Sequence, residues 1–457
     1  MEKVTGSNAV IKSLLKEKVD TIFGYPGGAI MPIYDSLYGY KNEINHILVR
    51  HEQGAIHAAQ GYARAGGKCG VVFATSGPGA TNLITGLADA MIDSTPVVCI
   101  TGQVHSSLLG TDAFQETDVI GISMPVTKWN IQITNAKDIP WAIAKAFYIA
   151  NSGRPGPVLI DITKDAQFEE IEFSYNYCNK IRSYYPLPKM NYSLIKNASK
   201  IINKAKKPLL LIGQGIILSE AENELLEFVN KSGIPVASTL LGLGSFPNNH
   251  PNYVGYLGMH GNYAPNIMTN ECDVLIAIGM RFDDRVTGNT SKYAKQAKVI
   301  HIDIDKSELN KIIPAEVAIH ADAKNALSEL IKLTNTSYHS NWISEFKILE
   351  KQEYQQVIKN SIMPQSEMIK MAEVVHFLSE QNDENSIIIT DVGQHQMITS
   401  RYYKYNQSKT NITSGGLGTM GFALPAAIGA KLGAKQKKVI AIIGDGGFQM
   451  NLSLIHI

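Results

Sequence analysis

Short apolar runs alternate with helix-like segments along most of this chain. The apolar runs are continuous rather than alternating with polar residues, which predicts strands that are buried on both faces of a parallel sheet. In the first third of the chain these runs are Ile47–Val49, Gly70–Ala74, Val97–Ile100 and Val158–Ile162. The segments between them have helical spacing, namely Gly54–Arg64, Thr81–Ile92 and Trp141–Ala150. The pattern predicts an α/β fold built from right-handed crossovers.

Two breaks in this alternation divide the chain into three predicted domains. Later apolar runs continue the strand pattern at Pro208–Ile212, Pro235–Thr239, Asp273–Ile278, Val299–Asp303, Ser386–Thr390 and Val439–Ile443. The breaks are an aromatic, Pro-containing stretch over 166–190 and a second stretch over 336–365, with a helix expected around Asn341–Lys359. We predict an N-terminal domain over 1–165, a central domain over 191–335 and an incomplete third domain over 366–457, all of the doubly wound parallel-sheet type.

Composition narrows the classes of protein that this chain can represent. It has 457 residues, 44% of them hydrophobic, with 42 Lys and Arg against 41 Asp and Glu, a net charge of +1. That balance argues against a nucleic-acid binder and against a membrane-surface protein. The four cysteines, Cys69, Cys99, Cys178 and Cys272, have neither disulfide-framework nor zinc-site spacing. With no secretory signal and no apolar run near the length of a membrane span, we expect a cytoplasmic protein outside the membrane.

The stretch VIAIIGDGGFQMN (Val439–Asn451) carries the strongest chemical signal. An apolar strand delivers four residues, Gly444 to Gly447, at its carboxyl end, where parallel sheets bind ligands. The glycines allow backbone to approach an anion, and Asp445 is a hard oxygen ligand suited to Mg²⁺. The alternative interpretation is an ordinary strand-to-helix turn with an aspartate cap.

A second glycine-rich turn precedes this stretch. Gly416, Gly418 and Gly421 satisfy GxGxxG, but the residues before them are polar and no ribose-binding acid follows, so a Rossmann site is weakly supported. A turn of this kind followed by a helix still suits a ligand lying against backbone. Met420 is an apolar side chain expected to project from the turn.

Glu52 is the candidate acid of the first domain. It follows the strand Ile47–Val49 and begins an Ala- and Gly-rich helix, against which another segment must pack closely. A carboxyl at the end of an internal strand with apolar neighbours is placed to have a raised pKa. The alternative is a helix N-terminal carboxylate stabilised by the helix dipole.

Three further loops are expected to form walls of the same cleft. Gly27 and Gly28 make a tight turn after a strand, and the segments VVFATSGPGATN and GQVHSSLLGTDAFQETD each follow a strand. The polar side chains that these two segments contribute are those of Thr75, Ser76 and Gln115. Each loop taken alone is compatible with ordinary turn chemistry.

In combination, YPGG, HEQGA, TSGPGATN, GTDAFQE, RFDDR and GLGTMG…GDGGFQMN resemble the thiamine-diphosphate enzyme superfamily. Within it, the chain is most similar to the large, catalytic subunits of acetolactate (acetohydroxyacid) synthases. The resemblance extends in the same order from about Gly24 to Asn451.

This resemblance implies roles for individual residues. Glu52 matches the glutamate that hydrogen-bonds the cofactor's aminopyrimidine ring, and Asp445 matches a ligand of Mg²⁺. Gly28 and Gln115 match residues on the substrate side. The remaining positions expected to bind thiamine diphosphate are Gly418, Met420, Gln394, His395, Gly444 and Gly446.

The central domain resembles the FAD-binding domain of the anabolic members. The signature RFDDR favours FAD over the flavin-free relatives, and in this family the flavin performs no net redox. Arg281 and Arg285 supply charge for its diphosphate. The implied FAD positions are Gly213, Gly215, Thr239, Leu240, Leu257, Gly258, Met259, His260, Gly279, Arg281, Asp283, Arg285, Val286, Asp303, Ile304, Asp322 and Ala323.

The implied activity is that of a transferase in valine, leucine and isoleucine biosynthesis. Pyruvate is decarboxylated on thiamine diphosphate, and the two-carbon unit is joined to a second pyruvate or to 2-oxobutyrate. The resemblance also implies a homodimer or homotetramer, with Glu52 facing the Gly418–Asp445 region of a neighbouring subunit, and a small regulatory subunit.

One departure from the family concerns the chain's last residues. Only 12 residues follow Asp445, and the family's second Mg²⁺ side-chain ligand lies further along than that, so a truncated chain is expected. Two alternatives stay open: an inactive fragment that keeps nucleotide or partner binding, and another FAD-containing decarboxylase or oxidase of the superfamily. GTDAFQE and RFDDR argue against the oxidase, and Glu52 argues against a glyoxylate carboligase, which lacks that acid.

Overall fold

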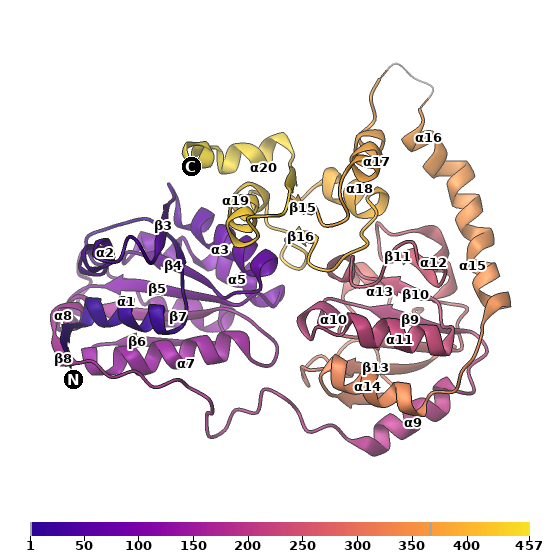
Figure 1. The fold of residues 1–457 in the computed structure, drawn as a ribbon, viewed down its shortest axis with the longest axis horizontal. Coiled ribbons are helices and arrows are strands. Elements are labelled where there is room, and N and C mark those ends of the chain that lie inside the picture. The colour runs from indigo at the N-terminus through magenta and orange to yellow at the C-terminus, as the bar shows by residue number, and fades with distance from the viewer. Residues whose placement is uncertain (1, 365–367) are drawn as a thin grey trace. The chain divides into compact units, whose positions relative to one another are not determined.

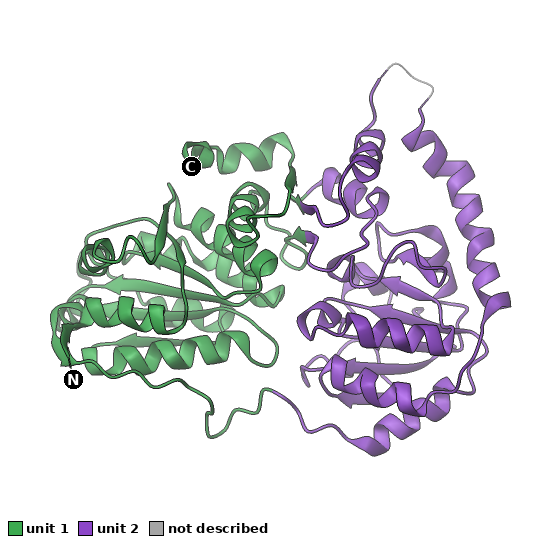
Figure 2. Cartoon of the chain, in the orientation of Figure 1, with its two compact units in different colours: residues 1–186, 389–392, 412–457 green, residues 187–388, 393–411 purple. Residues whose placement is uncertain are grey.

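The computed structural model describes residues 2–364 and 368–457 and forms two compact units (Figures 1 and 2). Unit 1 contains the residues up to 186 together with 389–392 and 412–457, and unit 2 contains 187–388 and 393–411. The predicted boundary between the second linker and the third domain, at residues 365 and 366, lies outside the described residues. Three larger sheets confirm the predicted α/β class.

Unit 1 is built on a six-stranded sheet in which every neighbouring pair is parallel. Its strands, in spatial order, are β3 (Asn45–Leu48), β2 (Thr21–Gly24), β4 (Gly70–Ala74), β5 (Val97–Gln103), β7 (Val158–Thr163) and β6 (Trp129–Ile133). The four predicted strands of this domain are therefore confirmed, with ends that differ by up to three residues.

Helices cover both faces of this sheet, as the continuous apolar strands predict. Val71 and Phe73 enter one core with α1, α2 and α7, whereas Val72 and Ala74 enter the other with α3 and α5. The helices are α1 (Gly6–Lys16), α2 (Met31–Tyr38), α3 (Glu52–Gly66), α4 (Pro78–Thr81), α5 (Ile84–Ile92), α6 (Val119–Ser123), α7 (Ile139–Asn151) and α8 (Lys164–Phe168). The single helix expected over Thr81–Ile92 is thus two helices.

A small antiparallel pair lies at the end of this unit. β1 (Lys3–Thr5) pairs with β8 (Glu170–Glu172), placing Val4 opposite Ile171, and both of these side chains are buried. The sequence analysis treated 166–190 as linker, because three-residue strands leave no recognisable period. The first residues of that stretch instead pair with the chain's N-terminal strand.

Unit 2 contains a second parallel six-stranded sheet. Its strands, in spatial order, are β11 (Tyr253–Tyr256), β10 (Val236–Ser238), β9 (Pro208–Ile212), β12 (Val274–Ile278), β13 (Lys298–Asp303) and β14 (Val317–His320). All four predicted strands are present, and β11 and β14 were not predicted. The helices packed around it include α9 (Tyr192–Ile202), α10 (Gly215–Leu218), α11 (Glu222–Ser232), α12 (Tyr263–Met268), α13 (Asp284–Thr287), α14 (Ala323–Leu333) and α15 (Ser340–Glu353).

The helix expected around Asn341–Lys359 continues past α15 as a short π-helical turn, Tyr354–Ile358, and α16 (Lys359–Ile362). The last sheet has the order β16 (Asn411–Thr413), β15 (Ile387–Thr390), β17 (Val439–Ile442). Its helices are α17 (Met371–Gln381), α18 (Gln394–Tyr402), α19 (Ala423–Gly433) and α20 (Asp445–Met450).

The prediction that every strand is buried on both faces is wrong for two edge strands, β3 and β17. Ile47 and Leu48 of β3 are half-buried. In β17, Ala441 is exposed and the other three residues are half-buried. The physical reason is that both are edge strands, with β2 and β15 as their respective neighbours in the sheet order.

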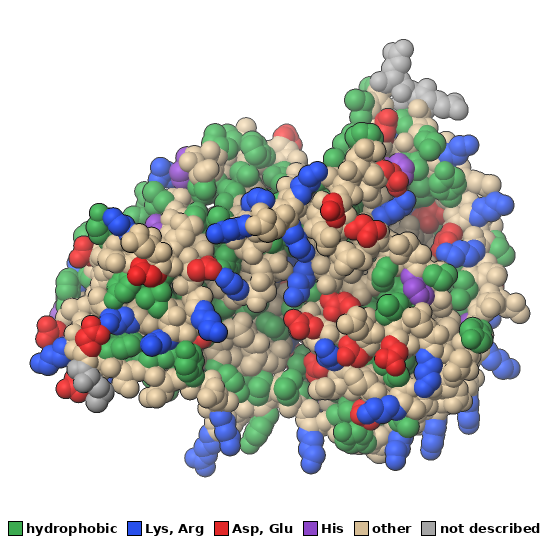
Figure 3. Space-filling model, viewed as in Figure 1, with side chains coloured by type: hydrophobic (Ala, Val, Ile, Leu, Met, Phe, Trp, Pro, Cys, Tyr) green, Lys and Arg blue, Asp and Glu red, His purple; other side chains and the backbone are tan. Residues whose placement is uncertain are grey.

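Basic and acidic side chains are interspersed over the face of the molecule seen in Figure 3. Among the described residues, no helix combines the length and the apolar character that a membrane crossing requires.

Candidate functional site

The candidate residues of the first domain lie at one edge of the unit 1 sheet. The carboxyl ends of parallel strands meet at the same edge, and β3, β2, β4 and β5 are consecutive neighbours. Glu52 follows β3, Gly28 follows β2, Thr75 follows β4 and the loop carrying Gln115 follows β5. The sheet therefore gathers four sequence segments, of which the outermost, at Gly28 and Gln115, are 87 residues apart, at one edge.

Glu52 is the first residue of α3 and is 7% exposed. Its Oε2 accepts a hydrogen bond of 2.9 Å from the Asn82 side-chain amide. The cap of α3 is His51, whose Nδ1 accepts from the Gln53 N–H at 3.1 Å. The other Glu52 oxygen, Oε1, lies 3.1 Å from the position of a Cβ on Gly79, so the carboxylate contacts the segment that follows Thr75. Asn82 lies within the predicted TSGPGATN segment but was not singled out, since an asparagine at a helix end usually has a capping role.

The glycine turn and the Thr75 segment pack directly on each other. The Ala29 N–H donates to Thr75 Oγ1 at 3.3 Å, and a Cβ placed on Gly27 would lie 2.5 Å from the Thr75 Cβ. By contrast, no atom lies within 4 Å of a Cβ placed on Gly28, which is exposed. Gly28 is therefore the open position of this turn and Gly27 the tightly packed one.

Gln115 is held against the same edge by backbone contact. Its φ is +59°, and its carbonyl oxygen lies 2.8 Å from the position of a Cβ on Gly77, whose own φ is +57°. The exposed side chains of Phe114 and Gln115 extend from this loop. Ser76, predicted as part of the wall, is instead buried, because it lies at the start of the packed Gly77–Gly79 turn.

The two glycine-rich turns of the last domain lie together in unit 1. Gly418 and Gly421 have φ values of +71° and +84°, which glycine adopts without strain. The methyl carbon of Met420 lies 3.4 Å from the position of a Cβ on Gly446, next to the exposed Asp445. Gly444 precedes α20 as its cap residue, and Asp445 opens the helix. The structure therefore brings Met420 to the GDGG turn.

Asp391, which the sequence analysis missed, is the centre of this arrangement. It follows β15 and is fully buried, and its carboxylate accepts from the N–H groups of Gly421 at 3.0 Å and Ala423 at 2.9 Å. A Cβ on Gly447 would lie 2.6 Å from Asp391 Oδ1. An acid directly after a predicted strand is the signal that identified Glu52, and it was available here too.

The predicted close packing on the Glu52 helix is confirmed, and its partner is α19. A Cβ on Gly61 would lie 1.9 Å from the Ala426 carbonyl oxygen, and one on Gly429 would lie 1.8 Å from the Ala58 carbonyl oxygen. Asn451 adds a polar link, donating to the Gly421 carbonyl at 2.6 Å beside Gly54 in the first turn of α3. Both helices belong to unit 1 of a single chain, and the predicted two-subunit arrangement stays a prediction.

Buried ionisable groups surround this helix pair. Burial, together with the charge of Asp89, raises the pKa of Asp93 to about 6. Burial lowers the pKa of His57 to about 4, and it also lowers the pKa of the fully buried Arg64. Arg64 Nη1 lies 3.7 Å from Asp93 Oδ2 and donates to the Thr413 carbonyl at 2.7 Å.

A separate buried carboxyl, Asp161 on β7, predicts a measurable pH dependence. Its oxygens accept from Thr101 Oγ1 at 2.6 Å and from the Gln103 and Gln132 amides at 3.0 Å, and burial raises its pKa to about 6. The folded state thus holds a proton that the unfolded chain has already lost above about pH 4. This contribution to stability is present at low pH and is lost as the pH rises through about 6.

Asp161→Asn removes this titration, so the stability difference between wild type and variant must change with pH. We expect the variant to gain on the order of 2 kcal/mol relative to wild type between about pH 4.5 and 7.5. Urea unfolding at several pH values measures the difference. A difference that is the same at every pH would contradict the assignment.

In unit 2 the candidate residues also lie at the carboxyl edge of the sheet. The strand order reverses between β9 and β12, and such a switch point is where open α/β sheets bind ligands. Gly213 and Gly215 follow β9, and Gly279 follows β12. The Gly215 N–H donates to the Gly279 carbonyl at 2.9 Å, and a Cβ on Gly213 would lie 2.3 Å from that oxygen. These glycines therefore serve close backbone packing at the switch point.

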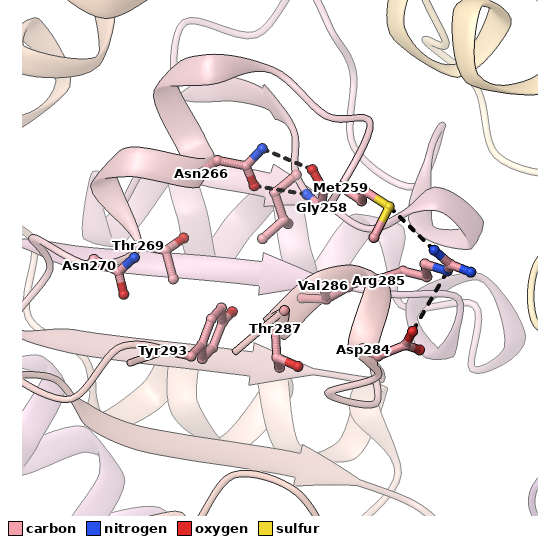
Figure 4. A pocket seen from close by; sticks show the side chains of 12 residues that line it. Gly258, Met259, Asn266, Thr269, Asn270, Asp284, Arg285, Val286, Thr287 and Tyr293 are labelled. Atoms are coloured by element: carbon pink, nitrogen blue, oxygen red, sulfur yellow. Dashed lines mark hydrogen bonds and ion pairs between the residues drawn. The ribbon is translucent and has the colours of Figure 1, made fainter. Parts of the chain in front are cut away.

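A pocket of about 300 Å³ opens beside this edge (Figure 4). Five predicted FAD positions line it, namely Leu257, Gly258, Met259, Arg285 and Val286, while the other FAD positions lie outside its lining. The lining residues that were not predicted are Asn266, Thr269, Asn270, Asp284, Thr287, Gly288 and Tyr293. Asp284 belongs to the RFDDR motif but was not singled out, and the others come from helix and loop positions whose neighbours are known only after folding.

Two of these residues shape the pocket, Asn266 by holding its backbone and Tyr293 by presenting a polar atom. The Asn266 amide holds Gly258 from both sides, accepting from its N–H at 3.0 Å and donating to its carbonyl at 2.9 Å. The Tyr293 hydroxyl is buried and has no hydrogen-bond partner within the described part of the chain. Arg285 Nη1 lies 3.3 Å from the Met259 sulfur and is exposed. A ligand in the pocket could therefore meet a hydroxyl, a thioether and a guanidinium.

The side chains at three other predicted FAD positions cap helices or bond to backbone in a turn. Asp283 Oδ1 caps α13 by accepting from the N–H groups of Arg285 and Val286, both at 3.1 Å. Asp322 caps α14, and Asp303 accepts from the Asp305 N–H at 2.8 Å. The remaining positions, which follow strands at the same edge, are Thr239, Leu240, His260, Arg281, Ile304 and Ala323.

Gln394 and His395 begin α18 in unit 2, and Gln394 is exposed. No group of three or more His, Cys, Asp or Glu side chains among the described residues could by itself hold a metal ion. A cation at Asp445 would need further oxygen ligands, and phosphate oxygens commonly supply them to Mg²⁺.

Three models of thiamine pyrophosphate enzyme domains match this chain. They describe the N-terminal TPP binding domain over residues 4–122, the central domain over 195–330 and the C-terminal TPP binding domain over 391–456. Fold, site and matches together define a thiamine pyrophosphate enzyme.

Curated relatives narrow this class further. The chain is 47% identical to the acetolactate synthase large subunit of Corynebacterium glutamicum, over 98% of this chain and 72% of the relative. It is 46% identical to the acetolactate synthase large subunit of Lactococcus lactis, over 98% of this chain and 78% of the relative. The probable acetolactate synthase large subunit of Methanocaldococcus jannaschii is also 46% identical, over 98% and 76%. The chain belongs to the acetolactate synthase large-subunit family of thiamine pyrophosphate enzymes.

Proposed function

We propose that this protein is the catalytic subunit of an acetolactate synthase. It decarboxylates pyruvate with thiamine diphosphate and joins the two-carbon unit to a second pyruvate, giving 2-acetolactate, or to 2-oxobutyrate, giving 2-aceto-2-hydroxybutyrate. This is the first common step in the synthesis of valine, leucine and isoleucine. The observation that supports the proposal most is the 46–47% identity to acetolactate synthase large subunits, together with the close packing of α3, which begins at Glu52, on α19, which follows the Gly418–Gly421 turn.

The residues present fit thiamine diphosphate. The glycine backbone at Gly418 leaves an open surface, and the 46% exposed side chain of Met420 can support a bent ligand. Asp445 can hold Mg²⁺ against a diphosphate, together with the backbone of Gly444 and Gly446. The cofactor roles proposed for Gln394 and His395 rest on the resemblance alone, since both residues belong to unit 2.

Bound thiamine diphosphate would supply a nucleophilic carbon and a cationic ring able to accept the electron pair that decarboxylation releases. Glu52 Oε1 and Oε2 would share a proton with the cofactor's pyrimidine ring, which is the role a nearly buried carboxyl can perform. Asn82 fixes the orientation of that carboxyl through its 2.9 Å bond. Gly28, with open space around it, and Gln115 would line the substrate side.

Product analysis tests this proposal. Incubated with pyruvate, thiamine diphosphate and Mg²⁺, the protein is expected to form 2-acetolactate, which is converted to acetoin by acid and measured colorimetrically. Omitting Mg²⁺ after chelation should remove the product. Acetate or acetyl phosphate as the product would identify an oxidase instead, and product formation that is unaffected by chelation would contradict the role of Asp445.

FAD is proposed as the ligand of the unit 2 pocket, whose lining includes Tyr293, Asn266 and Arg285. We expect Arg285→Glu to weaken FAD binding by roughly tenfold or more, since it reverses the charge that faces the diphosphate. Titration of flavin fluorescence measures the affinity. Lys196→Glu, which reverses an exposed charge on α9 of the same unit, outside the pocket lining, is the matched control. An equal loss in both variants would show a general charge effect and not a site.

Family membership supports further proposals about assembly and location. We propose a homodimer or homotetramer that associates with a small regulatory subunit, acts on pyruvate and 2-oxobutyrate, and works in the cytoplasm. Sedimentation of the purified chain with and without its small subunit tests the assembly.

A further inference from the structure

Two carboxylates of α5 contact the turn that carries Gly418 and Met420. Asp89 and Asp93 are one helical turn apart, and both are fully buried. Asp93, the residue that ends α5, uses one oxygen for each of two backbone donors. Its Oδ2 accepts from the Gly415 N–H and its Oδ1 accepts from the Gly416 N–H, both at 2.8 Å.

Asp89 contacts the same turn through hydroxyl groups. Its Oδ1 accepts a short hydrogen bond from Ser414 Oγ and a second one, of 3.2 Å, from Thr419 Oγ1. Ser414 Oγ in turn accepts from the Thr419 N–H at 2.8 Å. The two ends of the segment Ser414–Thr419 are thereby tied to each other and to a single carboxylate oxygen.

Burial of two carboxylates on one helix is costly unless each is paired. Arg64 lies within ion-pair distance of Asp93, and His57 Nδ1 lies 3.9 Å from Asp89 Oδ2. One guanidinium thus faces two acids. Apolar side chains of similar volume would fill this interior at a lower desolvation cost. Stability alone gives no reason for the pair, whereas holding backbone N–H groups in a defined turn does.

We propose that Asp89 and Asp93 are positioning residues, which hold the Ser414–Gly421 turn in the conformation that presents Gly418 and Met420 to the cofactor. The role of the turn in cofactor binding rests on the proposed function, whereas the contacts of Asp89 and Asp93 with the turn do not depend on it. The carboxylates themselves touch the turn and not the expected cofactor position.

The two acids differ in a way that makes the proposal testable. In Asp93→Asn, one oxygen is replaced by an NH₂ group, which faces a backbone N–H donor and leaves it without an acceptor. In Asp89→Asn, Oδ1 can still accept both hydroxyl bonds, and the NH₂ replaces Oδ2, which makes none of the bonds to the turn. If the two acids acted only through their charge, Asp93→Asn would not disturb the turn more than Asp89→Asn does, since each variant removes one buried charge.

Amide hydrogen exchange of the chain without cofactor is the first measurement. We expect the Gly415–Gly416 amides to exchange at least about tenfold faster in Asp93→Asn, and to stay within about threefold of wild type in Asp89→Asn. Calorimetric titration with thiamine diphosphate and Mg²⁺ is the second measurement. The dissociation constant should rise about tenfold or more in Asp93→Asn and change little in Asp89→Asn.

The outcomes of these two measurements distinguish the positioning role of the acids from the proposed function. Unchanged exchange in a folded Asp93→Asn, or equal acceleration in both variants, overturns the inference. Asymmetric exchange with an unchanged dissociation constant also overturns it, because the turn would then not matter to the cofactor. If wild type binds no thiamine diphosphate while the exchange asymmetry is present, the proposed function fails and the positioning of the turn stands.

Discussion

Glu52→Gln is expected to lower the rate of acetolactate formation by roughly 10²- to 10⁴-fold, the range that proton transfer by a positioned side chain contributes. Glutamine keeps the size of the side chain and can still accept the 2.9 Å bond from Asn82, so the fold should be preserved. It cannot share a proton with the cofactor's pyrimidine ring. The measurement is acetoin-based product detection at saturating thiamine diphosphate and Mg²⁺, beside the circular dichroism spectrum of the variant.

Glu353→Gln provides a matched control for the loss of a buried carboxylate. Glu353 is 6% exposed and lies in unit 2, where it pairs with Arg401. We expect this variant to be less stable, because it leaves Arg401 with a weaker partner, yet to keep its turnover per folded molecule. Glu52→Gln with wild-type turnover would falsify the proposed role of Glu52, and a comparable loss in both variants would attribute it to stability.

Gly429→Ala is expected to destabilise unit 1 by about 3 kcal/mol, against the usual effect of this substitution. In an unobstructed helix, alanine in place of glycine stabilises by about 1 kcal/mol. In α19 the added methyl group would lie 1.8 Å from the Ala58 carbonyl oxygen, so the two helices would have to separate. Urea unfolding measures the change, and faster proteolysis within 412–457 should accompany it.

Gly39→Ala serves as the control, since Gly39 ends α2 with a helical φ of −65° and is expected to show the ordinary gain. The double variant Gly61→Ala/Gly429→Ala gives a sharper test. Each methyl group strikes a different carbonyl of the same helix pair, so the second should cost less once the helices have separated. Stabilisation by Gly429→Ala, or fully additive losses, would contradict backbone-to-backbone packing of α3 with α19.

The strands of both large sheets were the most predictable part of the fold. β4 and β9 have the predicted bounds, because each is a continuous apolar run of five residues that is followed by a turn. The strands that were missed, such as β11, β14 and the β1–β8 pair, are short or contain polar residues. Their pairing depends on neighbours that are distant in sequence, which no local period reports.

The sequence predicted which strand ends carry candidate residues, but not which side chains contact one another in the folded site. Glu52, Met420 and Asp445 were found because each follows a strand or a glycine turn. Asp391 was missed although it directly follows a predicted strand. The α5 acids were missed too, although their carboxylates hold the turn that carries Met420. An aspartate within a helix pattern is most often a solvated residue, so only burial distinguishes it.

The sequence by itself determined the α/β class, the order of the strand-end motifs and the family resemblance, since each depends on residue types at fixed local spacings. The tertiary structure alone decided that α3 and α19 meet at Gly61 and Gly429, that Asp89 and Asp93 reach Ser414–Thr419, and that Tyr293 lines the unit 2 pocket. The physical reason is that such contacts join segments up to several hundred residues apart. Their geometry depends on which helix and sheet faces pack against each other and exclude water, and this is determined only in the folded chain.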